Sequence, residues 1–591
     1  MSPDSDQELG RARPASPPTP SGEPPVRGAG PAVGPPPFPR GGEARTGGHA
    51  RDRVGRARRW LRTTPARVWL LTVVCLVSLA GLFGSATLTL NQARGGLDVV
   101  GHAAGPQALA TTNLYLALAD MDARTADVLL MGTGHDLGSG RAEALERYEA
   151  SRGRANEALL QAASLIEDNA EEGGTGADGS GEEGAEEATA GEVATGEDGA
   201  GEGDAGEGRA EERSVQELNL QAVLDGMGAY ERLATEARLL NDEAQAPPGN
   251  VDEAALESYR EATHLMHTEL LPKAFNVGLD SSAIVRANHE EGQSAVALGL
   301  VWVGAAGAVT LVAMVVLQLY LRVRFRRRVN APVLAATAGT ALLTAGVVLA
   351  LVASGGHQRD AKDGLDAAMA LSRAGAISTV MQADQSRFLA EPEQAGADNY
   401  QQVYLERAQQ VLFRPADNLD DYYEAIGEVV AEYPDLPGPD GADRGGADGR
   451  DGEEDEDPGT LGYLGRSAQE ALASSGREEP LPSQEQALAD VLASYDALQA
   501  EDRELRAAAD RGDTDSAVAI RMGIAHAEDG AFRAYEDALG ELTGQHTAEF
   551  DGGIGRGDSV LAPWSWLLPA GTVVLLALVV AGVRPRLAEY R

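Results

Sequence analysis

The stretch VWLLTVVCLVSLAGLFGSATLTL, residues 68–90, decides the fold, because it carries no charge and is long enough to span a bilayer. A helix of about 20 apolar residues crosses the roughly 30 Å of hydrocarbon. Three more uncharged stretches of similar length follow, at 295–319, 332–353 and 563–583. A buried core helix could imitate one of them, but four with basic flanks predict four transmembrane helices.

Arginines cluster before the first stretch, between the second and third, and after the fourth. The positive-inside rule therefore places 1–66, 320–331 and 584–591 in the cytoplasm, with both termini. The long segments 91–294 and 354–561 then lie outside the plasma membrane. The basic loop between the second and third stretches contains Arg322, Arg324, Arg326, Arg327 and Arg328.

A net charge of -42, with 71 Gly and 29 Pro, indicates that part of the chain cannot form a packed core. We expect disorder in the Pro- and Arg-rich tail, 1–66, and in two acidic Gly-rich inserts at 169–212 and 435–458. The inserts could bind calcium, but neither contains an EF-hand loop. A solvated spacer is the simpler interpretation of both.

Catalytic motifs are missing from the sequence. Cys75 is the single cysteine and lies within the first apolar stretch, so helix packing has to stabilise the outer segments. There is no G-x-S-x-G, no H-E-x-x-H and no phosphate-binding loop ending in Lys. The apolar stretches also lack the ionisable residues of a transporter. We expect no enzyme, no cofactor and no nucleic-acid partner.

The two outer segments share a pattern. Gly96-Leu97-Asp98 opens the first and Gly364-Leu365-Asp366 opens the second. In the third helix of each, Tyr, Leu, Glu, Arg and Leu recur at the same spacing: Tyr230, Leu233, Glu236, Arg238 and Leu240 against Tyr495, Leu498, Glu501, Arg503 and Leu505. Phe275 and His289 are spaced like Phe532 and His546. The chain is predicted to be a tandem duplication.

Apolar residues at helical spacing divide each outer segment into four helices, with turns at Gly132, Pro247-Pro248-Gly249, Glu391-Pro392 and Arg511-Gly512-Asp513. An up-down-up-down bundle brings its first and last helices to one end, where they can continue into the spans. The predicted fold is an all-α membrane protein with four transmembrane helices and two extracytoplasmic four-helix bundles.

Few residues suggest a binding site. Packing and an ion pair within the bundle are the simpler explanation for Arg238 and Arg503, and binding of a ligand carboxylate is the alternative. Arg124 is a third candidate, in a charged stretch with Asp120, Asp122 and Asp127 that we expect to be a solvated helix face. His264 and His267 lie near Glu261, but two imidazoles without a third ligand predict surface residues and no metal site.

The stretch LYLALADMDARTADVLLMG (114–132), followed by ALERYEASRGRANEALL (144–160), resembles the four-helix sensor domains of chemoreceptors. With TTPARVW (63–69) before the first span, the layout of roughly 55–591 resembles the actinobacterial four-span GlnX-type family. That resemblance implies a glutamine- or glutamate-binding lipoprotein outside, the soluble Ser/Thr protein kinase G inside, and a role in amino-acid sensing. The acidic inserts depart from the pattern.

Two functions stay open. A signal-transducing sensor in the lipid membrane, alone or as a homo-oligomer, would receive a ligand or a liganded binding protein. It would relay the change to the kinase through Arg324, Arg326, Arg327 and Arg328. A cell-envelope scaffold would hold partners without switching. Neighbouring genes for a solute-binding protein and a kinase would favour the sensor, and genes for wall synthesis the scaffold.

Overall fold

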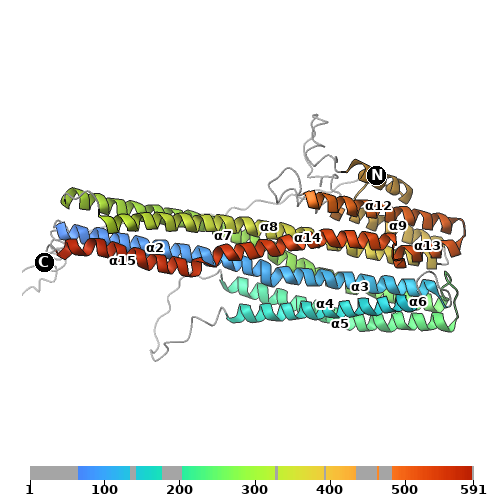
Figure 1. Cartoon of the computed structure of the whole chain (residues 1–591). Helices are drawn as coiled ribbons and strands as arrows, with labels where there is room; N and C mark the ends of the chain where they lie inside the picture. Colours follow the sequence, from blue (N-terminus) through green and yellow to red (C-terminus); the bar gives the residue numbers. More distant parts are fainter. Residues whose placement is uncertain are drawn as a thin grey trace, which may run out of the picture. The chain divides into compact units, whose positions relative to one another are not determined.

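The computed structural model describes residues 64–133, 141–175, 202–325, 330–391, 394–433, 462–464 and 482–588. The elements within these ranges are helices, with no strand among them, which confirms the predicted all-α class (Figure 1). The tail 1–66 lies almost wholly outside the described residues, and the insert 435–458 lies wholly outside them. In chain order the elements are α2 (Thr64–Asp98), η1 (Val99–Ala104), α3 (Gly105–Met131), α4 (Arg141–Thr175), α5 (Glu202–Glu243), α6 (Glu253–Leu265), η2 (Met266–Leu270), α7 (Leu271–Phe325), α8 (Ala331–Ala390), α9 (Gln394–Val411), α10 (Leu419–Glu432), α12 (Pro482–Asp510), α13 (Thr514–His526), α14 (Ala531–Leu561) and α15 (Trp564–Ala588).

Four helical runs are long and apolar enough to cross a membrane: Ala66–Met131, Gly292–Val323, Ala331–Ala390 and Thr514–Pro585. They contain the four predicted spans. The apolar parts of α2, α7, α8 and α15 lie side by side in Figure 1 and share one core. Large apolar side chains such as Val301 and Leu342 remain exposed on the outside, as a lipid-facing surface requires. The four apolar helices indicate a multi-pass membrane protein.

Glycines set the close approaches between these apolar helices. A Cβ on Gly307 of α7 would lie 2.5 Å from Thr344 of α8, and one on Gly339 of α8 would lie 2.7 Å from Leu575 of α15. A Cβ at either position would have to displace that neighbouring side chain, so glycine favours close packing of the helices here. Ala80 with Gly84, and Gly304 with Ala308, are small residues four apart, a spacing that predicts a similar contact, yet a Cβ on either glycine would meet no described atom within 4 Å. Small-residue spacing therefore does not identify the contact face by itself.

The first bundle consists of α3, α4, α5 and the run α6–η2–α7. Its core includes Leu118, Met121, Val223, Tyr230 and Leu270, each at most 1 % exposed. Two predicted turns are present: α3 ends at Gly132 with a positive φ of 61°, and Gly249 adopts φ 75° after α5. L side chains rarely adopt these angles, which explains glycine at both positions.

The second bundle consists of α8, the pair α9–α10, α12 and α14, with the short α13 before α14. Its core includes Leu371, Tyr404, Tyr422, Tyr495 and Tyr535, all fully buried. The predicted second helix is divided here, because Pro415 lies between α9 and α10 and a proline disfavours helix in the residue before it. Asn418 then caps α10 by accepting a hydrogen bond from the Asp421 amide at 3.0 Å.

Helices enter the acidic tract 169–212 from both sides. Helix α4 continues to Thr175, and α5 already begins at Glu202. Glu, Ala and Arg near both ends of the tract are good helix formers, so the flanking helices extend into it. The middle of the tract, 176–201, lies outside the described residues.

Residues Arg67–Arg591 form one compact unit. Helix α7 runs without interruption from the first bundle through the second span, and α8 runs from the third span into the second bundle. Helix α3 of the first bundle packs along α8, and α14 packs along the same helix (Figure 1). The two bundles thus meet along α3 and α8.

Candidate functional site: a buried charge network between the bundles

The charged stretch of α3 is buried, so the expected solvated face is wrong. Asp122 and Asp127 are at most 1 % exposed, and Asp120 and Arg124 are 7 % and 8 % exposed. The Nε of Arg124 lies 3.1 Å from Asp120, one turn away, and its Nη1 lies 3.7 Å from Asp127. This face of α3 meets the second bundle instead of water, which the helical period alone could not show.

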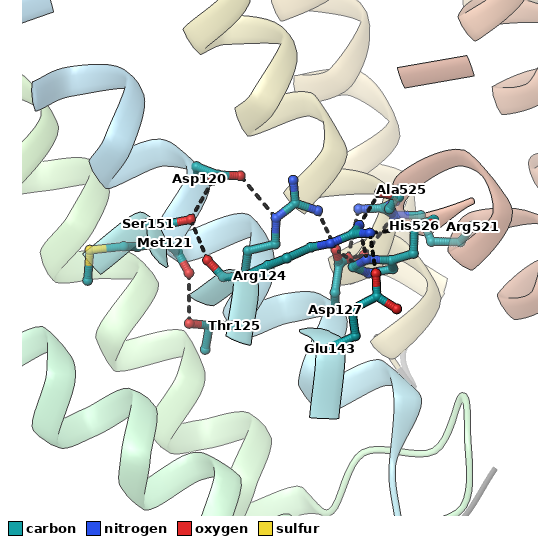
Figure 2. A network of polar contacts seen from close by, with 12 residues as sticks. Asp120, Met121, Arg124, Thr125, Asp127, Glu143, Ser151, Arg521, Ala525 and His526 are labelled. Atoms are coloured by element: carbon teal, nitrogen blue, oxygen red, sulfur yellow. Dashed lines mark hydrogen bonds and ion pairs between the residues drawn. The ribbon is translucent and has the colours of Figure 1, made fainter. Parts of the chain in front are cut away.

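Asp127 is the centre of the first half of the network. Its Oδ1 accepts hydrogen bonds from the Arg521 guanidinium of α13 and the Ser386 hydroxyl of α8, both at 2.7 Å. The Nε2 of His526 lies 3.2 Å from the other carboxylate oxygen. Figure 2 shows Arg521 and His526 reaching Asp127 from beyond α3. One carboxylate of the first bundle therefore joins two helices of the second.

Asp122 is the centre of the second half. It pairs with the Arg387 guanidinium of α8, which also donates to Asp384 at 2.7 Å. Tyr230 of α5 donates to Asp122 at 3.1 Å, and the His267 imidazole lies 3.4 Å from it. Hence Tyr230, of the repeated third-helix pattern, connects the core of the first bundle to the network. His267 faces this carboxylate, which corrects its expected place on the open surface.

Burial alone would raise the pKa of Asp122, but the Arg387 guanidinium, with help from His267, holds that pKa at about 2. Burial opposes Arg521, His526 and Arg124 in the same way at Asp127, and the pKa again lies well below its usual range. A carboxyl with a depressed folded-state pKa stabilises the fold above the unfolded-state value of about 4 and loses that contribution as the pH falls. The ion pairs of Asp122 with Arg387 and of Asp127 with Arg521 are therefore charged at neutral pH.

The network is closed at its edges by contacts from α4 and α6. Ser151 of α4 donates to Asp120 at 2.5 Å, and Arg147 lies 3.0 Å from the Nδ1 of His526. Arg260 of α6 pairs with Glu391, the residue directly after α8, at 2.6 Å. Charged groups from at least four helices thus fix the register of the two bundles.

The other sequence candidates lie apart from this network. The Arg238 guanidinium stacks 4.8 Å from the Tyr148 ring centroid, and the exposed Arg503 lies 3.4 Å from the exposed Asp420. A hollow of about 610 Å³ lies along α5, but Glu231, Thr235 and its other lining residues all belong to that one helix and do not include Arg238, so it is an open surface groove. Arg324 lies in the last turn of α7, while 326–328 fall outside the described residues.

The partners on the second bundle escape sequence reasoning. The apolar pattern of their helices is regular, so the sequence predicts ordinary surface charges at Asp384, Arg387 and Arg521. A signal is present on α8, where Ser378, Gln382 and Gln385 follow Leu371 and Ala374 at helical spacing on the core-facing side. Polar residues that continue an apolar face indicate a buried polar contact.

The fold and the network define an all-helical protein with four candidate spans and two bundles locked by charge. A family model, the actinobacterial sensor domain, matches residues 96–178 and 193–290. These residues run from the end of α2 through the first bundle into α7. No curated protein matches the chain, and no solved structure does. The match supports an actinobacterial sensor protein and suggests a sensing role.

Proposed function

We propose that the protein is a transmembrane sensor that relays extracytoplasmic amino-acid or binding-protein status to a cytoplasmic Ser/Thr kinase. One observation carries this: the sensor-domain match covers the bundle that α7 joins, in a single 55-residue helix, to a membrane span and to the basic loop after it. A displacement of the bundle can then reach the loop without crossing a break in the helix.

The proposal also places both bundles outside the membrane and derives them from a tandem duplication. Its support is the common order of elements, with α3, α4, α5 and α6–α7 corresponding to α8, α9–α10, α12 and α13–α14. Tyr230 and Tyr495 are both fully buried at the matching place of the third helix, and Leu97 and Leu365 are fully buried where each unit begins. The arginine asymmetry supports cytoplasmic termini.

The test replaces Arg324, Arg326, Arg327 and Arg328 with Gln, and Val329 with Lys to keep the loop basic. A ligand shifts the equilibrium between two states of a protein only by its difference in affinity for them. A partner kinase must therefore bind a group whose position differs between the states. We expect the variant to reach the membrane and to lose the amino-acid-dependent change in phosphorylation of the kinase's substrates.

The matched control replaces four arginines of the tail, Arg51, Arg53, Arg56 and Arg58, and should keep the response. These clusters commonly just set topology and hold anionic lipid. Equal phosphorylation responses in the wild type, the loop variant and a deletion strain would remove the sensor and leave the cell-envelope scaffold as the explanation.

A further inference from the structure

A further buried charge pair, Asp502 with Arg506, lies within the second bundle, apart from the network between the bundles. The Nε of Arg506 donates to Asp502, one turn earlier on α12, at 2.8 Å. Asp502 also accepts from Gln385 of α8 at 2.7 Å and from the Tyr423 hydroxyl of α10. Asp502 is fully buried and Arg506 is 6 % exposed. Both oxygens of the carboxylate therefore accept hydrogen bonds, from donors on three helices.

The guanidinium of Arg506, in contrast, keeps two nitrogens without a hydrogen-bond partner among the described residues. These nitrogens are Nη1 and Nη2, and both are buried. The Phe388 and Tyr404 ring centroids lie 4.9 and 4.6 Å from its Cζ, and such contacts stabilise the faces of the cation. The N–H groups point outward in its plane, and leaving buried charged donors unpaired is costly. Asp502 and the two rings thus hold a planar fork in one orientation.

Three glutamines add unpartnered polar atoms to the same core. The Oε1 of Gln385, the Nε2 of Gln499 and both amide atoms of Gln382 are buried without a partner among the described residues. Gln382 lies between Ser378, which donates to Tyr535, and Gln385 on one face of α8, so it also faces the bundle core. The cluster offers both donors and acceptors.

Helix packing does not by itself demand these polar groups. Gln499, Asp502 and Arg506 follow Tyr495 at the spacing at which Ala234, Ala237 and Asn241 follow Tyr230. Those three residues of the first bundle are fully buried as well. The first bundle therefore fills the corresponding layer of its third helix without any charge.

We propose that the second bundle binds a small organic carboxylate that carries a hydrogen-bond donor on the neighbouring carbon, as α-amino acids and α-hydroxy acids do. The carboxylate pairs with Nη1 and Nη2 of Arg506, the bidentate geometry that guanidinium favours. The amide oxygens of Gln385 and Gln382 accept from the ammonium or hydroxyl group. Arg506 is in the last turns of α12 and Phe388 in those of α8, so opening the end of the bundle gives access.

This site deepens the proposed sensing role by giving it a ligand class, but its test needs no kinase, so either proposal can fail alone. The full chain in lipid nanodiscs is titrated calorimetrically with L-alanine, L-lactate, propionate and L-alaninamide. We expect binding of L-alanine or L-lactate, weaker binding of propionate, and none of L-alaninamide, which lacks the carboxylate. The stronger of the first two identifies the donor group. No binding of any carboxylate, or equal binding of L-alaninamide, would overturn the proposal.

Variants assign the binding to this cluster. Arg506→Gln should weaken it by at least about tenfold, since a charged bidentate contact is lost. Arg503→Gln removes an exposed arginine from the same helix and should leave it unchanged. If Arg506→Gln alone unfolds the protein, the double variant Asp502→Asn/Arg506→Gln replaces it, because it leaves no unpaired charge in the core. Gln382→Leu tests the proposed acceptor on α8 without breaking any hydrogen bond that the structure shows. Wild-type affinity in the double variant, or a crystal grown with L-alanine that shows water alone beside Arg506, would refute the site.

Discussion

At the scale of single residues, Asp127 and Arg521 form a fully buried ion pair between the bundles. Desolvating two charges costs several kcal/mol, so such a pair adds little net stability against an apolar pair of the same volume. Removing one partner is different, because it leaves the other charge buried without compensation. The pair therefore fixes which face of α3 meets α8 and α13 more than it strengthens the contact.

Asp127→Asn should lower the free energy of unfolding by about 3–5 kcal/mol, because Arg521 keeps its charge in a buried place. Arg521→Met alone should cost a similar amount. The double variant should lose clearly less than the sum of the two, since neither charge is then left unpaired. Urea unfolding of the four proteins in nanodiscs, followed by circular dichroism, measures the coupling.

The matched pair for this cycle is Asp420 and Arg503, which lie 3.4 Å apart but are largely exposed. Solvent screens this pair, so its cycle should show no coupling beyond the error of measurement. Equal coupling in both cycles would mean that burial does not set the strength of the Asp127 contact.

At the scale of elements, α8 is the most informative helix. It has 60 residues and a length of about 90 Å, roughly three times the hydrocarbon thickness. Its first half is apolar, and its second half contacts the first bundle, α9 and α14. Gly355 and Gly356 follow the predicted end of the third span, and a Cβ on either would meet no described atom within 4 Å. The helix is thus weakest where it leaves the membrane.

Gly355→Ala and Gly356→Ala should each stabilise α8 by up to about 1 kcal/mol, because alanine loses less backbone entropy in a helix and has room here. Hydrogen exchange of the amides around 355 should slow. Gly364→Ala on the same helix is the control with the opposite sign. Its Cβ would lie 2.8 Å from the His546 carbonyl and 2.9 Å from the Phe550 amide of α14, so it should destabilise the pair of helices. Slower exchange in all three variants would contradict the close approach at Gly364.

At the scale of the whole molecule, sequence reasoning succeeds where one segment alone decides the outcome. The four apolar runs and the helix ends at Gly132 and Gly512 depend on local hydropathy and backbone freedom. It fails at Asp122 and Asp127, because the partners Arg387 and Arg521 lie more than 250 residues away in the chain. From sequence alone, a charged helix face is predicted to be solvated, because the helix that covers it is not known.

The arginine pattern around the spans sets the expected topology. Arginine flanks the cytoplasmic ends of the predicted spans, so α6 and the turn before α14 should lie outside the cell. In a Cys75→Ala background, single cysteines replace Glu253 and Asp529, both exposed, and Val329 of the basic loop. An impermeant maleimide applied to intact cells should label the first two, and Val329→Cys only after the membrane is opened.

Because both bundles join one compact unit through Asp127 and Arg521, labelling at only one of Glu253→Cys and Asp529→Cys would contradict the charge network as well as the topology. Labelling of Val329→Cys in sealed cells would show the opposite orientation, with the basic loop outside the cell and out of reach of a cytoplasmic kinase.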